Sequence, residues 1–227
     1  MKKFLNYFSH FEKLLWLFST IIIFASYFLF SNDGVLSLIA SLIGVTSLIF
    51  AAKANPVGPF LMIIFSILYS IISFSFRYYG EMITYLGMTL PMSAFSLAAW
   101  LKNPYKNNKS EVEVNSLNGK DIMLMALYTA VVTLIFYFIL KYFNTANLLF
   151  STLSIATSFA AAYLTFRRSA YYALAYAAND VILIVLWCFA TAEKNSYVSV
   201  VICFVIFLIN DLYGFFNWKR IKHKQRI

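Results

Sequence analysis

Residues 169–192 read SAYYALAYAANDVILIVLWCFATA, an apolar stretch long enough to cross a bilayer as a helix. Asn179 and Asp180 lie near its midpoint. A carboxylate at that depth costs a few kcal/mol or more, and such residues usually face a bundle interior or a water-filled path. Tyr172 and Tyr176 precede the pair at helical spacing, so they share a face with it. This face of aromatic rings, an amide and an acid predicts a binding site for a small polar solute.

The composition predicts an integral membrane protein. Of the 227 residues, 62% are hydrophobic and only 12% are charged, whereas a soluble domain has about 25% charged residues. The net charge of +9 lies in short loops and tails, where it sets topology, so nucleic-acid binding is not expected. The sequence contains no phosphate-cradling Gly-rich loop and no cluster of metal-ligating residues, and no cofactor is expected.

Eight apolar segments have the length of a membrane-spanning helix, at a rise of about 1.5 Å per residue. They lie near 13–30, 35–53, 59–77, 81–101, 121–141, 146–166, 169–192 and 196–218. The basic, amphipathic stretch 1–12 is expected to lie on the membrane surface and to be retained. Pro91, inside the fourth segment, is expected to kink its helix. The predicted fold class is an all-α membrane bundle of eight transmembrane helices.

The positive charges support an even number of segments. With both termini on one side of the membrane, that side holds fifteen Lys and Arg residues and the other side holds three, Arg77, Lys141 and Lys194, which together account for all 18. Cytoplasmic loops are enriched in Lys and Arg, so both termini are expected to be cytoplasmic.

An internal repeat is visible in the order of the segments. Thr46-Ser47 aligns with Thr157-Ser158, and Trp100 aligns with Trp218. Two three-helix units joined by one helix have the same orientation in the membrane, and parallel repeats of this kind occur in transporters with a site near the midplane. The predicted units are an N-terminal segment with an extra helix, a first repeat, a linker with the joining helix, a second repeat and a basic cytoplasmic tail: 1–30, 31–102, 103–144, 145–218 and 219–227.

Two further expectations concern the ends of the segments. Trp100 and Trp218 each end a segment, and the interfacial aromatic belt accounts for both without a functional role. The longest polar stretch, 102–120, is too short for a domain and is expected to be an exposed linker.

Other segments contribute further candidate site residues. Tyr69 lies in the repeat counterpart of the Asn-Asp segment, and Met92 lies in the counterpart of the last one. The last segment repeats the Asn-Asp pair, and Asn210 and Tyr213 share a face in it. Amides and phenols bind sugar hydroxyls or a carboxamide, and tyrosine rings stack on flat heterocycles. Polar contact between helices is the alternative interpretation, and it stays open for Asp211 as well.

A membrane-embedded enzyme and a scaffold are the competing function classes. Asp180 and Asp211 lie on adjacent segments and could form a catalytic carboxylate pair, but the aromatic and amide face suits a solute better. A scaffold needs no buried acid. The membrane segments contain Lys and Arg only at their ends and none inside that could neutralise a phosphate, so a phosphorylated substrate is not expected.

Four short motifs together resemble the nicotinamide riboside transporter (PnuC-type) family. They are GFFNW at 214–218, the Pro91-Met92 pair followed by Trp100, the Arg167-Arg168 pair, and the central Asn-Asp pair. The resemblance implies a 3+1+3 helix core with one extra N-terminal helix, distantly related to SWEET sugar transporters. It also implies a homotrimer in a bacterial cell membrane. The implied activity is facilitated uptake of nicotinamide riboside, a form of vitamin B3 and precursor of NAD, by alternating access, with trapping by a cytoplasmic kinase.

The sequence departs from the family pattern at one point. Family members commonly carry a Trp-x-x-Trp pair just before the central Asn or Asp, and Ala173 and Tyr176 stand at those positions here. One large ring is lost and the other is a phenol. The substrate therefore stays open between nicotinamide riboside, a deoxyribonucleoside and thiamine, which relatives of the same fold are thought to carry.

Overall fold

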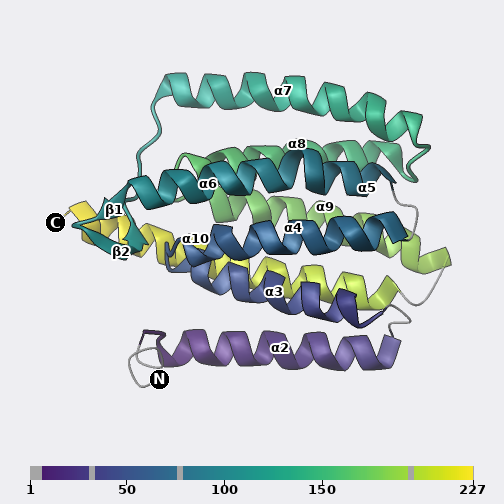
Figure 1. The fold of residues 1–227 in the computed structure, drawn as a ribbon, viewed down its shortest axis with the longest axis horizontal. Coiled ribbons are helices and arrows are strands. Elements are labelled where there is room, and N and C mark those ends of the chain that lie inside the picture. The colour runs from purple at the N-terminus through teal and green to yellow at the C-terminus, as the bar shows by residue number, and fades with distance from the viewer. Residues whose placement is uncertain (1–6, 31–33, 76–78, 194–196, 227) are drawn as a thin grey trace.

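The protein is a bundle of long helices in a computed structural model that describes residues 7–30, 34–75, 79–193 and 197–226 (Figure 1). The helices are α2 (His10–Phe30), α3 (Val35–Ala52), α4 (Val57–Ser75), α5 (Tyr79–Thr84), the π-helix η1 (Tyr85–Thr89), α6 (Leu90–Lys102), α7 (Gly119–Tyr142), α8 (Leu148–Phe166), α9 (Tyr172–Glu193) and α10 (Val198–Arg226). A short hairpin pairs β1 (Pro104–Tyr105) with β2 (Asn108–Val112).

Within these residues, eight helices are long and apolar enough to cross a membrane, with α5, η1 and α6 counted as one. The prediction of an all-α protein with eight transmembrane segments is confirmed. Most boundaries lie within a few residues of the predicted ones, but α10 continues to Arg226, through the predicted tail. The predicted surface segment 1–12 lies partly outside the described residues, and α2 already begins at His10.

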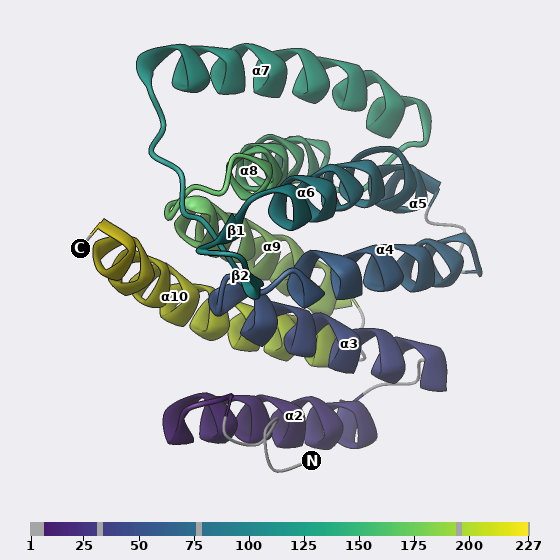
Figure 2. The same ribbon diagram turned by 60° about the vertical axis from the view of Figure 1, so that its left-hand side comes forward.

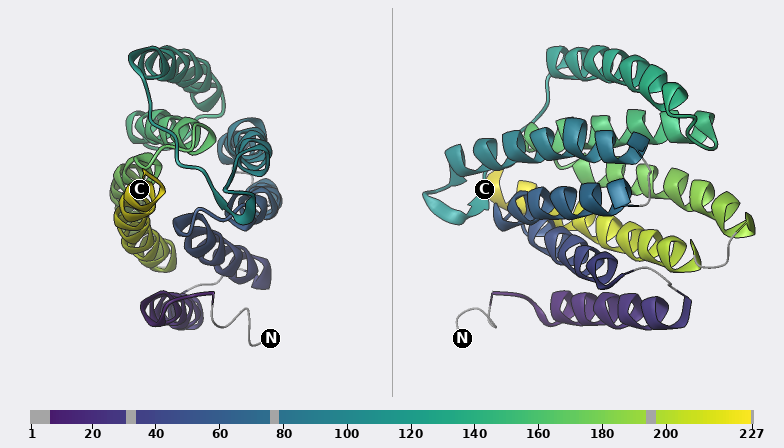
Figure 3. Two further views of the ribbon diagram at one scale, coloured as in Figure 1. Left: turned by 90° about the vertical axis from the view of Figure 1, so that its left-hand side faces the viewer. Right: turned by 45° about the vertical axis from the view of Figure 1, so that its right-hand side comes forward.

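Six helices form two facing layers, with α3, α4 and α6 on one side and α8, α9 and α10 on the other (Figure 3). The third helix of each layer packs against the first helix of the other, because α6 contacts α8 and α10 contacts α3. The helices α7 and α2 lie outside the layers at opposite edges (Figure 2). The start of α2 and the end of α10 lie at the same end of the bundle, called the terminal end here; the opposite end is the distal end.

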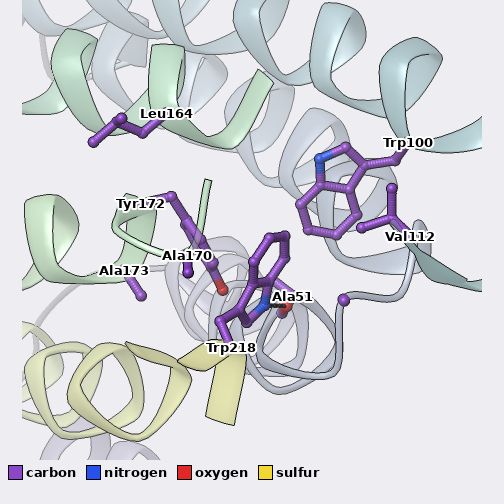
Figure 4. Packing of buried hydrophobic residues seen from close by; sticks show 9 residues of the cluster. Ala51, Trp100, Val112, Leu164, Ala170, Tyr172, Ala173 and Trp218 are labelled. Atoms are coloured by element: carbon purple, nitrogen blue, oxygen red, sulfur yellow. Dashed lines mark hydrogen bonds between the residues drawn. The ribbon is translucent and has the colours of Figure 1, made fainter. Parts of the chain in front are cut away.

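Two buried tryptophans hold the terminal end together (Figure 4). Trp100 and Trp218 are both 0% exposed, and their ring centroids are 5.3 Å apart. Trp100 Nε1 donates a hydrogen bond of 2.9 Å to the Thr165 carbonyl at the end of α8, and Trp218 Nε1 donates one of 2.7 Å to the Ala51 carbonyl at the end of α3. The prediction of an interfacial belt is wrong, because both rings are buried inside the bundle. Each indole adds a side-chain donor to a carbonyl at a helix end that also accepts from a backbone N–H of the following turn.

The helices α3 and α8 end in the same way. Ala54 and Arg168 adopt left-handed backbone conformations with φ of 55° and 56°. Asn55 N–H then donates to the Phe50 carbonyl, and Ser169 N–H donates to the Leu164 carbonyl. Both closures have the hydrogen-bond pattern of a Schellman motif.

The stretch 102–120 is not the exposed linker that was predicted. Its Val112 is fully buried, and its N–H donates to the Ala54 carbonyl. Asn115 N–H donates to the Arg168 carbonyl. The polar stretch therefore covers both left-handed helix ends, because their carbonyls need donors. The residues 106–110 of the hairpin and 118–120 at the start of α7 are exposed.

The helix that contains Pro91 was expected to be kinked. Its irregularity is a π-helical turn, Tyr85–Thr89, directly before Leu90 and Pro91. Leu90 N–H donates to the Tyr85 carbonyl five residues earlier. Proline has no N–H, so the ordinary α-helical ladder is interrupted here. Single π-turns are frequent at functional sites, and this one places Tyr85 and Thr89 beside the interior cavity that is described below.

A buried carboxylate near the start of the extra helix α2 bonds it to two other helices. Glu12 caps its own helix through a reciprocal pair with Ser9, whose N–H donates to Oε2 over 2.6 Å. Lys53 Nζ lies 3.1 Å from Oε2, and the Tyr213 hydroxyl donates to Oε1 over 2.8 Å. The carboxylate thus joins α2 to the end of α3 and to α10.

Replacing Glu12 with Gln should lower the melting temperature of the detergent-purified protein by about 5–10 °C. Breaking a buried ion pair costs about 3 kcal/mol, and each kcal/mol is about 2–4 °C for a chain of this size. Thermal unfolding followed by size-exclusion chromatography measures the shift. Glu113→Gln, at an exposed acid of the polar stretch, is the matched control and should not change it. Equal melting of the Glu12 variant and the wild type would show that this carboxylate does not hold α2.

Candidate functional site

A cavity lies between the two layers and is called the central cavity here. Side chains that line this cavity come from both layers and from α5, η1 and α7. In the part of the chain that the structure describes, its wall contains three acids, Glu81, Asp180 and Asp211, and no Lys or Arg. The wall is therefore acidic in a region where a charge without a partner is costly.

Asp180 is one of two acids that lie together at this cavity. The residue is 4% exposed, and its Oδ2 has no hydrogen-bond partner in the described chain. Its carboxyl group lies beside that of Asp211 from α10, within interaction distance. No Lys or Arg within residues 7–30, 34–75, 79–193 and 197–226 lines the cavity beside these two acids. The Oδ2 atom thus lies at the cavity without a hydrogen-bond donor from the described protein. Leaving a buried acceptor unpaired costs free energy, and a ligand that donates a hydrogen bond to it would recover this cost.

Asn179 supplies a donor next to this acceptor. Its Oδ1 accepts a hydrogen bond of 2.9 Å from the Thr157 hydroxyl of α8. The amide group is oriented by this contact, and its Nδ2 has no hydrogen-bond partner among the described residues. Asn179 and Asp180 both line the central cavity. Together they present an N–H donor and a carboxylate acceptor to whatever occupies it.

Aromatic side chains that carry a hydroxyl or an indole N–H also line the central cavity. Tyr176 and Trp187 come from α9, and Tyr69 comes from α4. The ring of Tyr69 lies 4.7 Å from that of Tyr85 on the π-helical turn, tilted by 43°. Such rings can stack on a flat heterocycle or face a cation.

Glu81 was not predicted as a site residue. It lies on α5 and lines the central cavity, a second cavity beside α2, and a third at the distal end. Trp187 is the other residue that lines all three. The sequence does contain a signal, namely an acid at the first position of the predicted segment 81–101, but hydropathy does not distinguish an acid that faces the interior from one that ends a loop.

Four predicted site residues lie away from the central cavity. Asn210 is buried against α2, where its Nδ2 donates to the Ser19 hydroxyl and to the Ile206 carbonyl. Tyr213 donates to Glu12 on the same side of α10. The other two pack in hydrophobic clusters, Tyr172 beside Trp218 and Met92 against the side chains between α7 and α8. The other four predicted residues line the central cavity together, namely Tyr69, Tyr176, Asn179 and Asp180. From the last segment, Asp211 lines this cavity and the predicted Asn210 does not.

Metal binding has no visible basis in the described part of the chain. No three His, Cys, Asp or Glu side chains come together there in a way that could hold an ion. The arrangement is instead one of single polar groups and rings around a space, which is typical of a site for a small organic solute.

Comparisons with known proteins agree with a solute site in a membrane. Residues 34–220 match a family described as nicotinamide mononucleotide transporter. The nicotinamide riboside transporter PnuC of Neisseria mucosa is 26% identical over 218 residues, covering 94% of this chain and 82% of the relative. The protein of the same name from Haemophilus influenzae is 25% identical over 190 residues, covering 83% and 81%.

A solved structure has the same fold. The structure described as the crystal structure of the vitamin B3 transporter PnuC superimposes with a TM-score of 0.80 at 22% identity. The match covers 96% of this chain and 94% of that chain. It therefore includes nearly all of the eight-helix arrangement.

Proposed function

Because this chain belongs to the nicotinamide mononucleotide transporter family, we propose that it carries nicotinamide riboside, or a closely related nucleoside, across the bacterial cell membrane. The family and the solved structure of the same fold are transporters, so the chain is not an enzyme. The alternative of a hydrolase built on the Asp180–Asp211 pair is thereby removed. It is a multi-pass membrane protein.

The single observation that carries the choice of substrate is the charge of the central cavity. Among the described residues, three acids and no Lys or Arg line it. A phosphate there would face carboxylates without a counter-ion, which is strongly unfavourable in a low dielectric. Nicotinamide riboside has no phosphate and bears a positive charge on its pyridinium ring. The wall thus favours the riboside over its 5′-phosphate, the mononucleotide.

The carboxamide of nicotinamide matches the two central polar groups. The Asn179 amide can donate to the carboxamide oxygen, and the unpartnered Asp180 Oδ2 can accept from the carboxamide N–H. Each contact satisfies a group that has no hydrogen-bond partner among the described residues, so binding removes a desolvation penalty rather than adding one.

The rings proposed to hold the heterocycle are Tyr176, Tyr69 and Tyr85. Ala173, at the first position of the Trp-x-x-Trp pattern, is fully buried and packs beside Gly214 of α10, not in the cavity. A ring there would have no room. A partner opposite Tyr176 must therefore come from another helix, and the tilted Tyr69–Tyr85 pair is the candidate that lines the same space.

We place the distal end outside the cell and both termini in the cytoplasm, since nearly all described Lys and Arg residues lie toward the terminal end. The third cavity, at the distal end, shares the lining residues Glu81, Thr145 and Trp187 with the central cavity. At the terminal end, the buried Trp100–Trp218 pair fills the space between the layers. Alternating access would then move the two three-helix repeats relative to each other. Passive transport, trapping by a cytoplasmic kinase and a homotrimer complete the proposal by family resemblance.

Uptake into proteoliposomes tests the substrate. Saturable uptake of nicotinamide riboside is expected, with nicotinamide mononucleotide at least about 100-fold weaker as a competitor, because a phosphate meets only acids in the cavity. A protonophore should leave the uptake unchanged.

Thymidine, deoxyadenosine and thiamine are measured in parallel. Uptake of a deoxynucleoside in place of nicotinamide riboside would mean that this chain serves another substrate branch of the fold, and uptake of thiamine alone would keep the cationic site but change its ligand. Absence of uptake for all of them would contradict the proposed function.

A further inference from the structure

A second cavity lies at the distal end between α2, α3, α4 and α10, and is called the outer cavity here. It is distinct from the central cavity, but the two share a wall that includes Phe65, Tyr69, Glu81 and Trp187. The helix α2 contributes Ile23, Ser26 and Tyr27 to it, among other residues. Since α2 precedes the part of the chain that matches the transporter family, 34–220, this cavity depends on a helix outside that match.

The wall of the outer cavity is rich in hydrogen-bond acceptors. Ser26 donates its hydroxyl proton to the Ile23 carbonyl, and Ser41 donates its proton to the Ser37 carbonyl, each over 3.0 Å. A serine that donates backward to its own helix can still accept through its oxygen, and Ser41 also contacts the Cys203 thiol across the cavity. Ser73 is 1% exposed, and its hydroxyl has no hydrogen-bond partner in the described chain. This buried group is therefore available to a ligand in the cavity that it lines.

Glu81 gives this acceptor-rich wall a negative charge. Its carboxyl group has no ion pair and no hydrogen bond among the described residues, whose two ion pairs are Lys53–Glu12 and Arg167–Asp121. An acid that faces a cavity among apolar helices is stabilised by a cation or by a donor group. The rings of Tyr69 and Trp187 beside it can face a positive charge as well.

We propose that the outer cavity is a second binding site for an organic cation that carries hydroxyl groups, occupied on the way to the central cavity. The proposal rests on the proposed function, because the cation would be the transported riboside. Glu81 holds the positive ring at the junction of the cavities, and the serine oxygens accept from the sugar hydroxyls. The site would raise the concentration of the cation at the entrance of the central cavity and discriminate against neutral solutes of the same shape.

Cys203 is a native reporter for this site, because it lines the outer cavity and does not line the central one. The experiment measures the rate of its modification by N-ethylmaleimide in the purified full chain. Cys188→Ser, at an exposed position on α9, removes the other thiol. Nicotinamide riboside should slow the modification at least about fivefold. The dihydro form, which has nearly the same shape but a neutral ring, should slow it little.

Three variants separate the outer site from the central one. Glu81→Gln should abolish the protection, and Ser73→Ala should weaken it about threefold, as expected for one lost hydrogen bond. Asp180→Asn should lose transport yet keep the protection, because Asp180 lines only the central cavity of the two. Size-exclusion profiles establish that each variant is folded.

The outcomes are distinguishable. Loss of protection in Asp180→Asn, or full protection in folded Glu81→Gln, would overturn the outer site, and so would equal protection by the two ring forms. Wild-type protein that transports nicotinamide riboside but shows no protection of Cys203 would overturn the outer site alone. Wild-type protein that transports none of the riboside would overturn the proposed function.

Discussion

Replacing Asp180 with Asn is expected to lower the uptake of nicotinamide riboside about 100-fold while leaving the protein folded. The substitution keeps the shape of the side chain and removes its charge. The unpartnered Oδ2, proposed to accept from the carboxamide, would no longer be part of a carboxylate. Hydrogen bonds to charged groups contribute about 1.5–3 kcal/mol, and about 1.4 kcal/mol corresponds to a tenfold change in affinity.

The measurement is initial uptake into proteoliposomes at a substrate concentration well below saturation. Glu113→Gln serves as the control, because it also removes one carboxylate but at an exposed position far from the cavities, and it should transport like the wild type. A second variant, Asp211→Asn, removes the neighbouring acid and should also reduce uptake. Normal uptake by Asp180→Asn would remove this residue from the site.

The largest effect on stability is expected for Trp218→Ala, which should lower the free energy of unfolding by about 3–5 kcal/mol, the usual range for deleting a buried tryptophan. The substitution leaves a cavity beside Trp100 and Tyr172. It also leaves the Ala51 carbonyl without its indole donor. Trp218→Phe keeps most of the volume and loses only the donor, so it should cost about 1–2 kcal/mol.

Melting in detergent, followed as the loss of monodisperse protein with temperature, ranks these variants. Trp16→Phe provides the comparison, because Trp16 is 39% exposed on α2 and its indole bonds a threonine hydroxyl rather than a helix end. It should melt within a few degrees of the wild type. If the melting temperature of Trp218→Ala equalled that of Trp16→Phe, the packing of Trp218 at the terminal end would not stabilise the bundle.

Much of the fold could be predicted because hydropathy is a local property. Each apolar segment must satisfy its own backbone hydrogen bonds in lipid, so its length and composition suffice to identify it as a helix. The linker 102–120 failed this reasoning, because its role is to donate to the Ala54 and Arg168 carbonyls, which belong to turns far away in the sequence. Its polar composition indicated exposure and could not reveal those partners.

The candidate site shows the same division at the level of single residues. Asn179 and Asp180 were predicted from their depth in the segment, and both line the central cavity. In the last segment the Asn-Asp pair was equally visible, but the prediction favoured Asn210, whereas Asp211 lines the cavity and Asn210 binds Ser19 of α2. Adjacent helical residues point about 100° apart, so the choice between them depends on where the neighbouring helices lie.

The sequence by itself determined that this protein is a membrane bundle of eight helices, that Asp180 and Asp211 lie inside membrane segments whose Lys and Arg residues are all at the segment ends, and that its motifs resemble one transporter family. These properties follow from composition, spacing and residue type. Only the tertiary structure decided that Trp100 and Trp218 close one end, that Glu81 stands where three cavities meet, and that α2 completes the outer cavity. The physical reason is that a partner for a carbonyl, an acid or an amide is supplied by whichever helix packs beside it, and packing joins residues that are distant in the chain.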